Sequence, residues 1–137
     1  MKFVLHGEPA VKKNSQRILN AGGRTIVAQS ELYKEYEQSA LWQIPKAAKQ
    51  LIDYPVNVKA IYYRSTKRTV DKSNLENALM DVLVRAGVLM DDNRDIVAAT
   101  DGSRVYYDKS DPRTEVEITR LEEDYEQWAK PKGRRSG

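Results

Sequence analysis

The stretch TVDKSNLENALMDVLVRAGVLMDDN, residues 69–93, decides the fold of this chain. Apolar side chains recur in it at the spacing of one face of an α-helix, at Leu75, Ala78, Leu79, Val82, Leu83 and Ala86. Ser73 followed by Glu76 has the spacing of a capping box, which places the helix N-terminus at Ser73. Gly87 stands where a helix-terminating glycine belongs. The stretch therefore predicts a helix over residues 74–86.

Acidic residues flank this helix on both sides. Asp71 precedes it, and Asp91 and Asp92 follow it after the apolar run Val88-Leu89-Met90. The helix is about 20 Å long, and the extended run covers roughly 17 Å back. If the run doubles back along the helix, Asp92 reaches Asp71, and paired aspartates suit Mg²⁺. The alternative is that these are solvated loop acids beside helix ends.

The composition excludes several kinds of site. The 137 residues are enough for one domain with its own core. No cysteine is present, which excludes disulfides and thiolate zinc sites, and His6 as the only histidine excludes a multi-histidine metal site. No apolar run is long enough to cross a membrane, and the N-terminus lacks a signal-peptide pattern. We therefore expect a cytoplasmic protein without a membrane segment.

The net charge of +3 is modest, but the basic residues are clustered. Residues 9–30 contain no acid, and a second basic group surrounds Asp71. Lysine and arginine bind the phosphates of DNA. The candidate DNA-binding residues are Lys12, Lys13, Arg17, Arg24, Lys67, Arg68 and Lys72. Such clusters are also common on ordinary solvated surfaces.

The remaining chain predicts a sheet around the helix. Alternating or β-rich patterns indicate strands at residues 2–7, 55–64, 96–99, 104–107 and 114–121. Residues 16–19 and 24–27 flank a glycine-rich turn and predict a β-hairpin. A second helix should run from Glu31 towards Gln50, capped by Ser30 and kinked or split at Pro45. The order predicts an α+β domain over residues 1–128, with helices packed on a small mixed sheet, and a basic tail over residues 129–137.

The central stretch resembles the RusA-type Holliday junction resolvases. The resemblance lies in Asp71-Lys72-Ser73-Asn74-Leu75, the helix ending at Ala86-Gly87, and the pair Asp91-Asp92. It implies a RusA-like fold and a homodimeric, Mg²⁺-dependent endonuclease. Such enzymes cut four-way junctions or other branched DNA in recombination and repair, and are common in prophages. The catalytic acids would be Asp71 and Asp92, with Asp91 as a neighbouring metal ligand or a structural acid.

Two positions depart from the pattern of that family. Ser73 occupies the place of a second acid, and Asn77 occupies the place of a lysine. Glu76 could supply the missing carboxylate oxygen, although a capping box explains it fully, and Lys72 could supply the missing cation. The sequence thus leaves open a catalytically impaired branched-DNA-binding protein of the same fold. A small interaction module whose acids are merely surface residues is a third possibility.

Overall fold

The computed structural model describes residues 1–11, 16–21, 24–29 and 31–122. Along the chain the elements are β1 (Lys2–His6), β2 (Gln16–Ala21), β3 (Arg24–Gln29), α1 (Glu31–Gln43), the short 3-10 helix η2 (Lys46–Ala48), β4 (Val56–Arg64), α2 (Lys72–Arg85), β5 (Val97–Ala99), β6 (Arg104–Tyr107) and β7 (Arg113–Arg120). The basic tail predicted for residues 129–137 lies outside the described residues.

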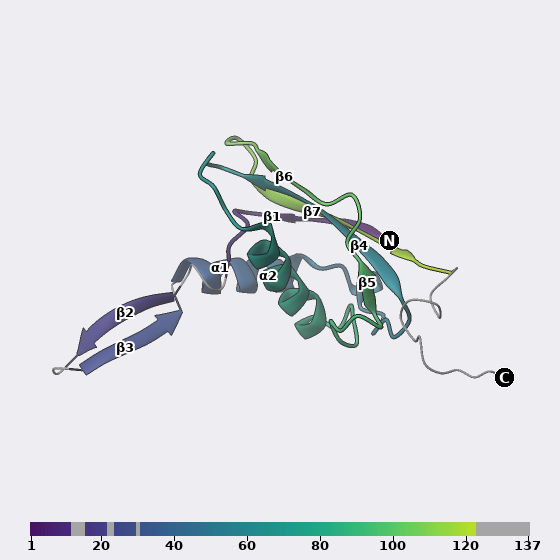
Figure 1. The fold of residues 1–137 in the computed structure, drawn as a ribbon, viewed down its shortest axis with the longest axis horizontal. Coiled ribbons are helices and arrows are strands. Elements are labelled where there is room, and N and C mark those ends of the chain that lie inside the picture. The colour runs from purple at the N-terminus through teal and green to yellow at the C-terminus, as the bar shows by residue number, and fades with distance from the viewer. Residues whose placement is uncertain (12–15, 22–23, 30, 123–137) are drawn as a thin grey trace.

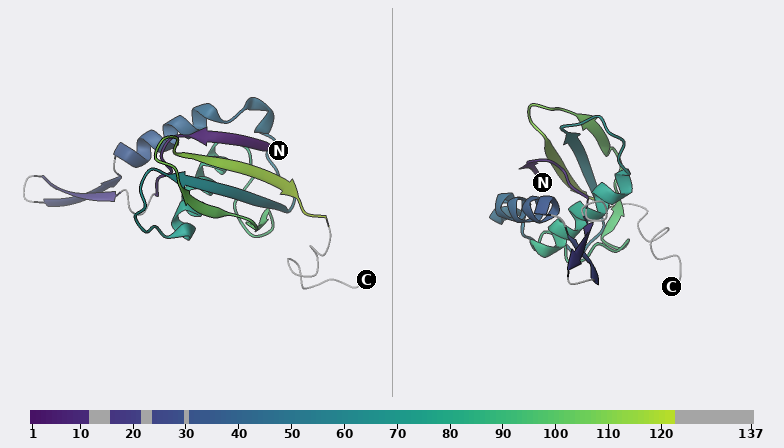
Figure 2. Two further views of the ribbon diagram at one scale, coloured as in Figure 1. Left: turned by 90° about the horizontal axis from the view of Figure 1, so that it is seen from above. Right: turned by 90° about the vertical axis from the view of Figure 1, so that its left-hand side faces the viewer.

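The sheet is mixed, with β4 at its centre. Strand β7 lies between β1 and β4 and is antiparallel to both. Strands β5 and β6 run parallel to β4, β5 beside its beginning and β6 beside its end. Both helices lie on the same side of this sheet, and α1 runs along β1 (Figures 1 and 2). The predicted α+β class, with helices packed on a small mixed sheet, is confirmed.

The core forms between α2 and the sheet face that α2 covers. On β4 every second side chain is buried, from Val56 to Tyr62, as expected for a strand with one covered face. The apolar stripe of α2 faces these side chains, and Leu75, Leu79 and Leu83 are almost fully buried. The apolar face of α2 packs against the apolar face of β4, and the helix runs along the sheet. The start of α2 lies towards the end of β4, and the end of α2 lies towards the beginning of β4 (Figure 1).

The predicted hairpin is present as the two-stranded sheet of β2 and β3, which projects from the rest of the domain in Figure 1. The first helical region is split at Pro45, one of the two outcomes predicted there. Helix α1 ends at Gln43, and Pro45 precedes the separate turn η2, because a proline ring disrupts the preceding helical turn. Its predicted cap, Ser30, lies outside the described residues.

Candidate functional site

Asp71 is the N-cap of α2. Its Oδ1 accepts a hydrogen bond from the backbone N–H of Ser73 at 3.1 Å and another from the Ser73 hydroxyl at 2.8 Å. The helix therefore begins two residues earlier than the predicted capping box allows, and that box is wrong. An aspartate caps as well as a serine and also carries a charge that the helix dipole favours. Asp71 is exposed, and its Oδ2 accepts no hydrogen bond from the described residues.

Glu76 and Lys72, the two residues that could compensate for the departures from the family pattern, form an ion pair with each other. The Lys72 ammonium lies 3.3 Å from a Glu76 carboxylate oxygen, as an i,i+4 pair on α2. Glu76 also lies near the buried Tyr62 phenol, whose pKa is raised above its usual range by burial and, to a lesser degree, by this carboxylate. Glu76 is therefore paired, whereas the Asp71 carboxylate at the start of α2 keeps one oxygen without a hydrogen bond from the described residues.

The loop between β4 and α2, residues 65–70, is held in place from both sides. Arg64 at the end of β4 donates from Nη1 to the Arg68 carbonyl at 2.7 Å. The Glu8 carboxylate accepts from the Ser65 N–H at 3.1 Å. The Arg68 N–H binds the hydroxyl of Thr66 at 2.9 Å. The loop therefore presents its two exposed cations, those of Lys67 and Arg68, a few residues before Asp71.

Asp91 and Asp92 lie at the other end of α2, so the expected return of residues 88–90 along the helix is wrong. The N–H groups of Val88 and Leu89 bind the Leu83 carbonyl at 2.9 and 3.3 Å, and the Met90 N–H binds the Ile52 carbonyl at 2.9 Å. The Asn93 carbonyl then accepts from Val97 at the start of β5. These hydrogen bonds hold residues 88–90 at the C-terminal end of α2. Because the two ends of the helix are about 20 Å apart, Asp92 does not reach Asp71 within one chain.

The two acids of this second group differ. The Asp91 carboxylate accepts from the Asp92 N–H at 2.7 Å and from the Asn93 amide at 3.3 Å, which closes the turn. Asp92 is exposed, and its side chain has no hydrogen-bond or ion-pair partner among the residues that the structure describes. The geometry thus supports the structural reading of Asp91 and leaves Asp92 as a free carboxylate.

Within one chain these acids do not complete a metal site. The described part of the chain contains no group of three or more acidic or histidine side chains that could hold a metal ion. Asp71 offers one free oxygen at one end of α2, and Asp92 offers a free carboxylate at the other. A divalent ion bound by both an Asp71 and an Asp92 carboxylate would therefore need one of the two from another copy of the chain.

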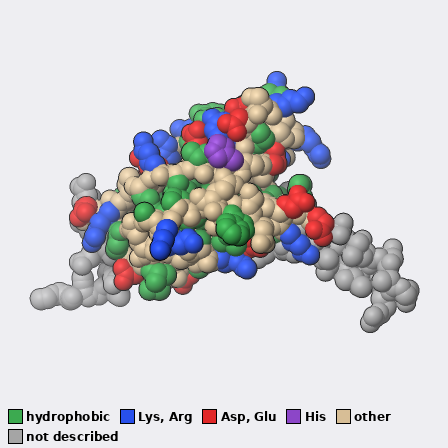
Figure 3. Space-filling view, turned by 180° about the vertical axis from the view of Figure 1, so that it is seen from behind, with side chains coloured by type: hydrophobic (Ala, Val, Ile, Leu, Met, Phe, Trp, Pro, Cys, Tyr) green, Lys and Arg blue, Asp and Glu red, His purple; other side chains and the backbone are tan. Residues whose placement is uncertain are grey.

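Two of the other predicted DNA-binding residues lie on the strands of the hairpin. Arg17 on β2 pairs with Ala28, and Arg24 on β3 pairs with Ala21. Lys12 and Lys13 lie outside the described residues. On the face that carries α1 and β1, Lys and Arg side chains are scattered among acidic and hydrophobic ones (Figure 3). That face therefore shows no continuous basic patch. Lys67 and Arg68, by contrast, are consecutive exposed residues of one loop.

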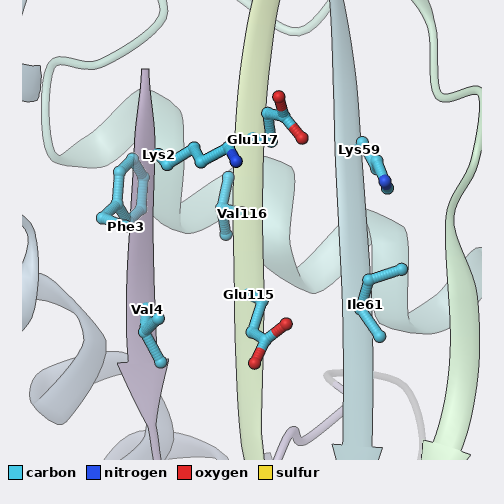
Figure 4. Close-up of a pocket in the computed structure, with 8 residues that line it drawn as sticks. All are labelled: Lys2, Phe3, Val4, Lys59, Ile61, Glu115, Val116 and Glu117. Atoms are coloured by element: carbon cyan, nitrogen blue, oxygen red, sulfur yellow. The ribbon is translucent and has the colours of Figure 1, made fainter.

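A hollow of about 390 Å³ lies on the sheet face opposite the helices. Figure 4 shows Lys2, Lys59, Glu115 and Glu117 around it on β1, β7 and β4. It is an open groove on the sheet face that α2 leaves uncovered. It contains neither Asp71 nor Asp92, and its charged residues alternate in sign, so it is not the candidate catalytic site.

Two contacts near Asp71 could not be read from the sequence. Glu8 anchors the Ser65 N–H from 57 residues away, and Tyr107 lies beneath the Lys67 ammonium, 5.0 Å from it to the ring centre. Both depend on which strands pair, and strand pairing has no local signature. The adjacent tyrosines 106 and 107 in a predicted strand were the one available signal.

Within the described ranges, no helix is long and apolar enough to cross a membrane. A search of curated proteins found no match. A family model described as "Endodeoxyribonuclease RusA" matches residues 6–119, from the last residue of β1 almost to the end of β7. The match includes Asp71, the basic loop before it, α2 and Asp92. This chain therefore belongs to the RusA endodeoxyribonuclease family.

Proposed function

We propose that this protein is a Mg²⁺-dependent endonuclease that cuts four-way junctions or related branched DNA in recombination and repair, acting in the cytoplasm as a homodimer. The observation that carries the proposal is the family match over residues 6–119, which include β4, α2 and most of β7, together with a free Asp71 oxygen at the helix N-terminus and the exposed cations of Lys67 and Arg68 in the loop before it. The family indicates the class of reaction, which is hydrolysis of DNA. Asp71 and the cations of the loop before it are the residues that we propose take part in that reaction.

The best candidates for binding DNA phosphates are Lys67 and Arg68 in the basic loop, residues 65–70. Lys67 and Arg68 are exposed, and neither side chain is paired with a carboxylate among the described residues. A free cation gives up no ion pair when a phosphate arrives, and each phosphate neutralised releases counterions. Lys72 is less available, since Glu76 already holds its ammonium. Arg17 and Arg24 on the hairpin would extend the contact to a neighbouring DNA arm.

Because Asp71 and Asp92 lie at opposite ends of α2, a metal site that uses both requires a dimer. A two-fold dimer brings the same surface of each subunit to the other. We assign the metal to Asp71 of one subunit and Asp92 of the partner subunit, so that a dimer holds two equal sites. Exposed apolar side chains beside the second group of acids, Leu51 (54% exposed) and Met90 (52%), favour a protein contact there.

When bound, a divalent ion would polarise the scissile phosphate and activate a water molecule. The residues of this chain have simpler tasks. Asp71 is oriented by its two bonds from Ser73, which leave Oδ2 free for a ligand. Lys67 and Arg68 bind the DNA backbone on either side of the phosphate that is cut. An in-line attack needs that phosphate held still, and rigid anchoring of the loop by Glu8 and Arg64 supplies this.

The second candidate is a branched-DNA-binding protein of the same fold with impaired catalysis. Ser73 supports it, because its hydroxyl donates to Asp71 where the family pattern has an acid. Asn77 supports it as well, because it stands in place of a lysine and the nearest cation on α2, Lys72, is paired with Glu76. This candidate predicts junction binding without cleavage.

One experiment separates the two candidates. Purified protein is incubated with an end-labelled four-way junction and with a linear duplex of the same sequence, with Mg²⁺ and with a chelator. Cleavage of the junction only with Mg²⁺ is the expected result. The Asp71→Asn variant is the control, because asparagine caps a helix equally well and the variant should stay folded while losing cleavage. Junction binding without cleavage would favour the second candidate, and no preference for the junction would contradict both.

A further inference from the structure

Tyr107, the last residue of β6, lies at the same end of the sheet as the basic loop. Its register partner on β4 is Arg64, the residue directly before that loop. The Lys67 ammonium sits over the tyrosine ring, 5.0 Å from the ring centre. Figure 1 shows the ends of β4 and β6 together, with the loop running from there to the start of α2. A large aromatic side chain is thus placed between the sheet and the loop that leads to Asp71.

The ring is accessible, since 45% of Tyr107 is exposed. The acids around it are already satisfied. Arg113 binds Asp108 at 2.9 Å, and this bond, with those from Ser110 and the backbone, holds the pKa of Asp108 below its ordinary value. Glu8 accepts the Ser65 N–H. The Lys67 and Arg68 cations have no carboxylate partner among the described residues. An anionic ligand therefore meets uncompensated positive charge next to an exposed ring.

We propose that Tyr107 is a stacking platform for a DNA base at the branch point, and that Lys67 moves from its ring to a backbone phosphate when DNA binds. A cation over a tyrosine ring is held weakly at an exposed site, whereas a phosphate attracts it strongly. Its departure frees the ring face. Every nucleic-acid base has a flat face that stacks on an aromatic side chain, so the contact is independent of base identity.

The branch is the place where such a face is available. Inside a linear duplex each base is covered by its neighbours, but at the centre of a junction the terminal pairs of the arms can expose a face. The platform would therefore add to affinity for branched DNA and little to affinity for a linear duplex. This inference rests on the proposed function, and it names the side chain that recognises the branch.

Tyr106 provides a matched control on the same strand. Its exposure is 50%, close to that of Tyr107. Successive residues of a strand face opposite sides of the sheet, and the Tyr106 ring packs on Tyr63 at 5.7 Å between ring centres, on the opposite side from the contact between Tyr107 and Lys67. Replacing Tyr106 removes an equally exposed tyrosine without touching Lys67.

The test compares affinities for a four-way junction and a linear duplex, without divalent metal, for Tyr107→Leu, Tyr107→Phe and Tyr106→Leu. Leucine removes the aromatic face, and phenylalanine keeps it. We expect Tyr107→Leu to weaken junction binding about 10-fold and to leave duplex binding within a factor of about two. Tyr107→Phe and Tyr106→Leu should bind both substrates as the wild type does. Equal losses on junction and duplex, or an unchanged junction affinity for Tyr107→Leu, would overturn the inference.

A second measurement needs no substitution in the protein. Wild-type protein is cross-linked by light to junctions that carry 5-iodouracil at the branch, and the modified residue is identified by peptide mass. An adduct on Tyr107 is the expected result, and adducts only elsewhere would contradict the platform. If the wild type itself shows no preference for the junction, the proposed function fails as well. If the wild type prefers the junction and Tyr107→Leu retains that preference, this inference alone fails.

Discussion

The assignment of each metal site to two subunits predicts the behaviour of mixed dimers. Two variants, Asp71→Asn and Asp92→Asn, should each form dimers that cannot cut a junction, because every site lacks one carboxylate. Both should fold as the wild type does. Asparagine caps α2 in place of Asp71, and Asp92 is exposed with no partner among the described residues. Their inactivity therefore reports on the site and not on stability.

A heterodimer with one subunit of each variant should regain activity. One of its sites contains both substitutions and lacks both carboxylates. The other combines the intact Asp71 of one subunit with the intact Asp92 of the partner subunit. With one working site of two, we expect about half of the wild-type rate of first-strand cutting. The product should be a nicked junction, because the second strand has no working site. The heterodimer is obtained by co-expression with two different tags and purification on both.

The reciprocal heterodimer provides the control. It joins a wild-type subunit to a subunit that carries both substitutions. If each site takes one acid from each subunit, neither site is complete and cleavage should fall to background. If each subunit holds its own site, the wild-type subunit keeps about half of the activity. An inactive single-variant heterodimer together with an active reciprocal one would refute the assignment, and so would a monomeric wild type by light scattering.

The following predictions concern binding and stability. Replacing Lys67 and Arg68 together by alanine should weaken DNA binding for all sequences alike and reduce the salt slope of log K by about 2; an unchanged slope in a salt titration would remove them from the interface. Asp71→Ala should lose the helix cap and about 1 kcal/mol of stability relative to Asp71→Asn; equal melting temperatures would contradict the capping geometry. Thr114 is fully buried and its hydroxyl has no hydrogen-bond partner among the described residues, so Thr114→Val should raise the melting temperature by about 3 °C; a fall would indicate a partner for that hydroxyl.

Much of the fold could be predicted because its patterns are local. The alternation in residues 55–64 predicted β4, and the apolar stripe of residues 75–86 predicted α2 and the face by which it packs. Gly87 has φ +83°, the left-handed conformation expected of a glycine after a helix. The helix start was misplaced because Asp71 and Ser73 both suit a cap. Only the packing of residues 69–74 selects between them.

The sequence by itself determined the element types, the α+β class, the family resemblance and the identity of Asp71, Asp92 and the basic residues as candidates. Only the tertiary structure decided where these residues stand. Hydrogen bonds from the run of residues 88–90 to Leu83 and Ile52 keep Asp92 at the end of α2 opposite Asp71. Strand pairing places Tyr107 beneath Lys67 and Glu8 beside Ser65. Such contacts join residues that are tens of positions apart, and their free energy comes from burial of the whole sheet face, which no short stretch of sequence encodes.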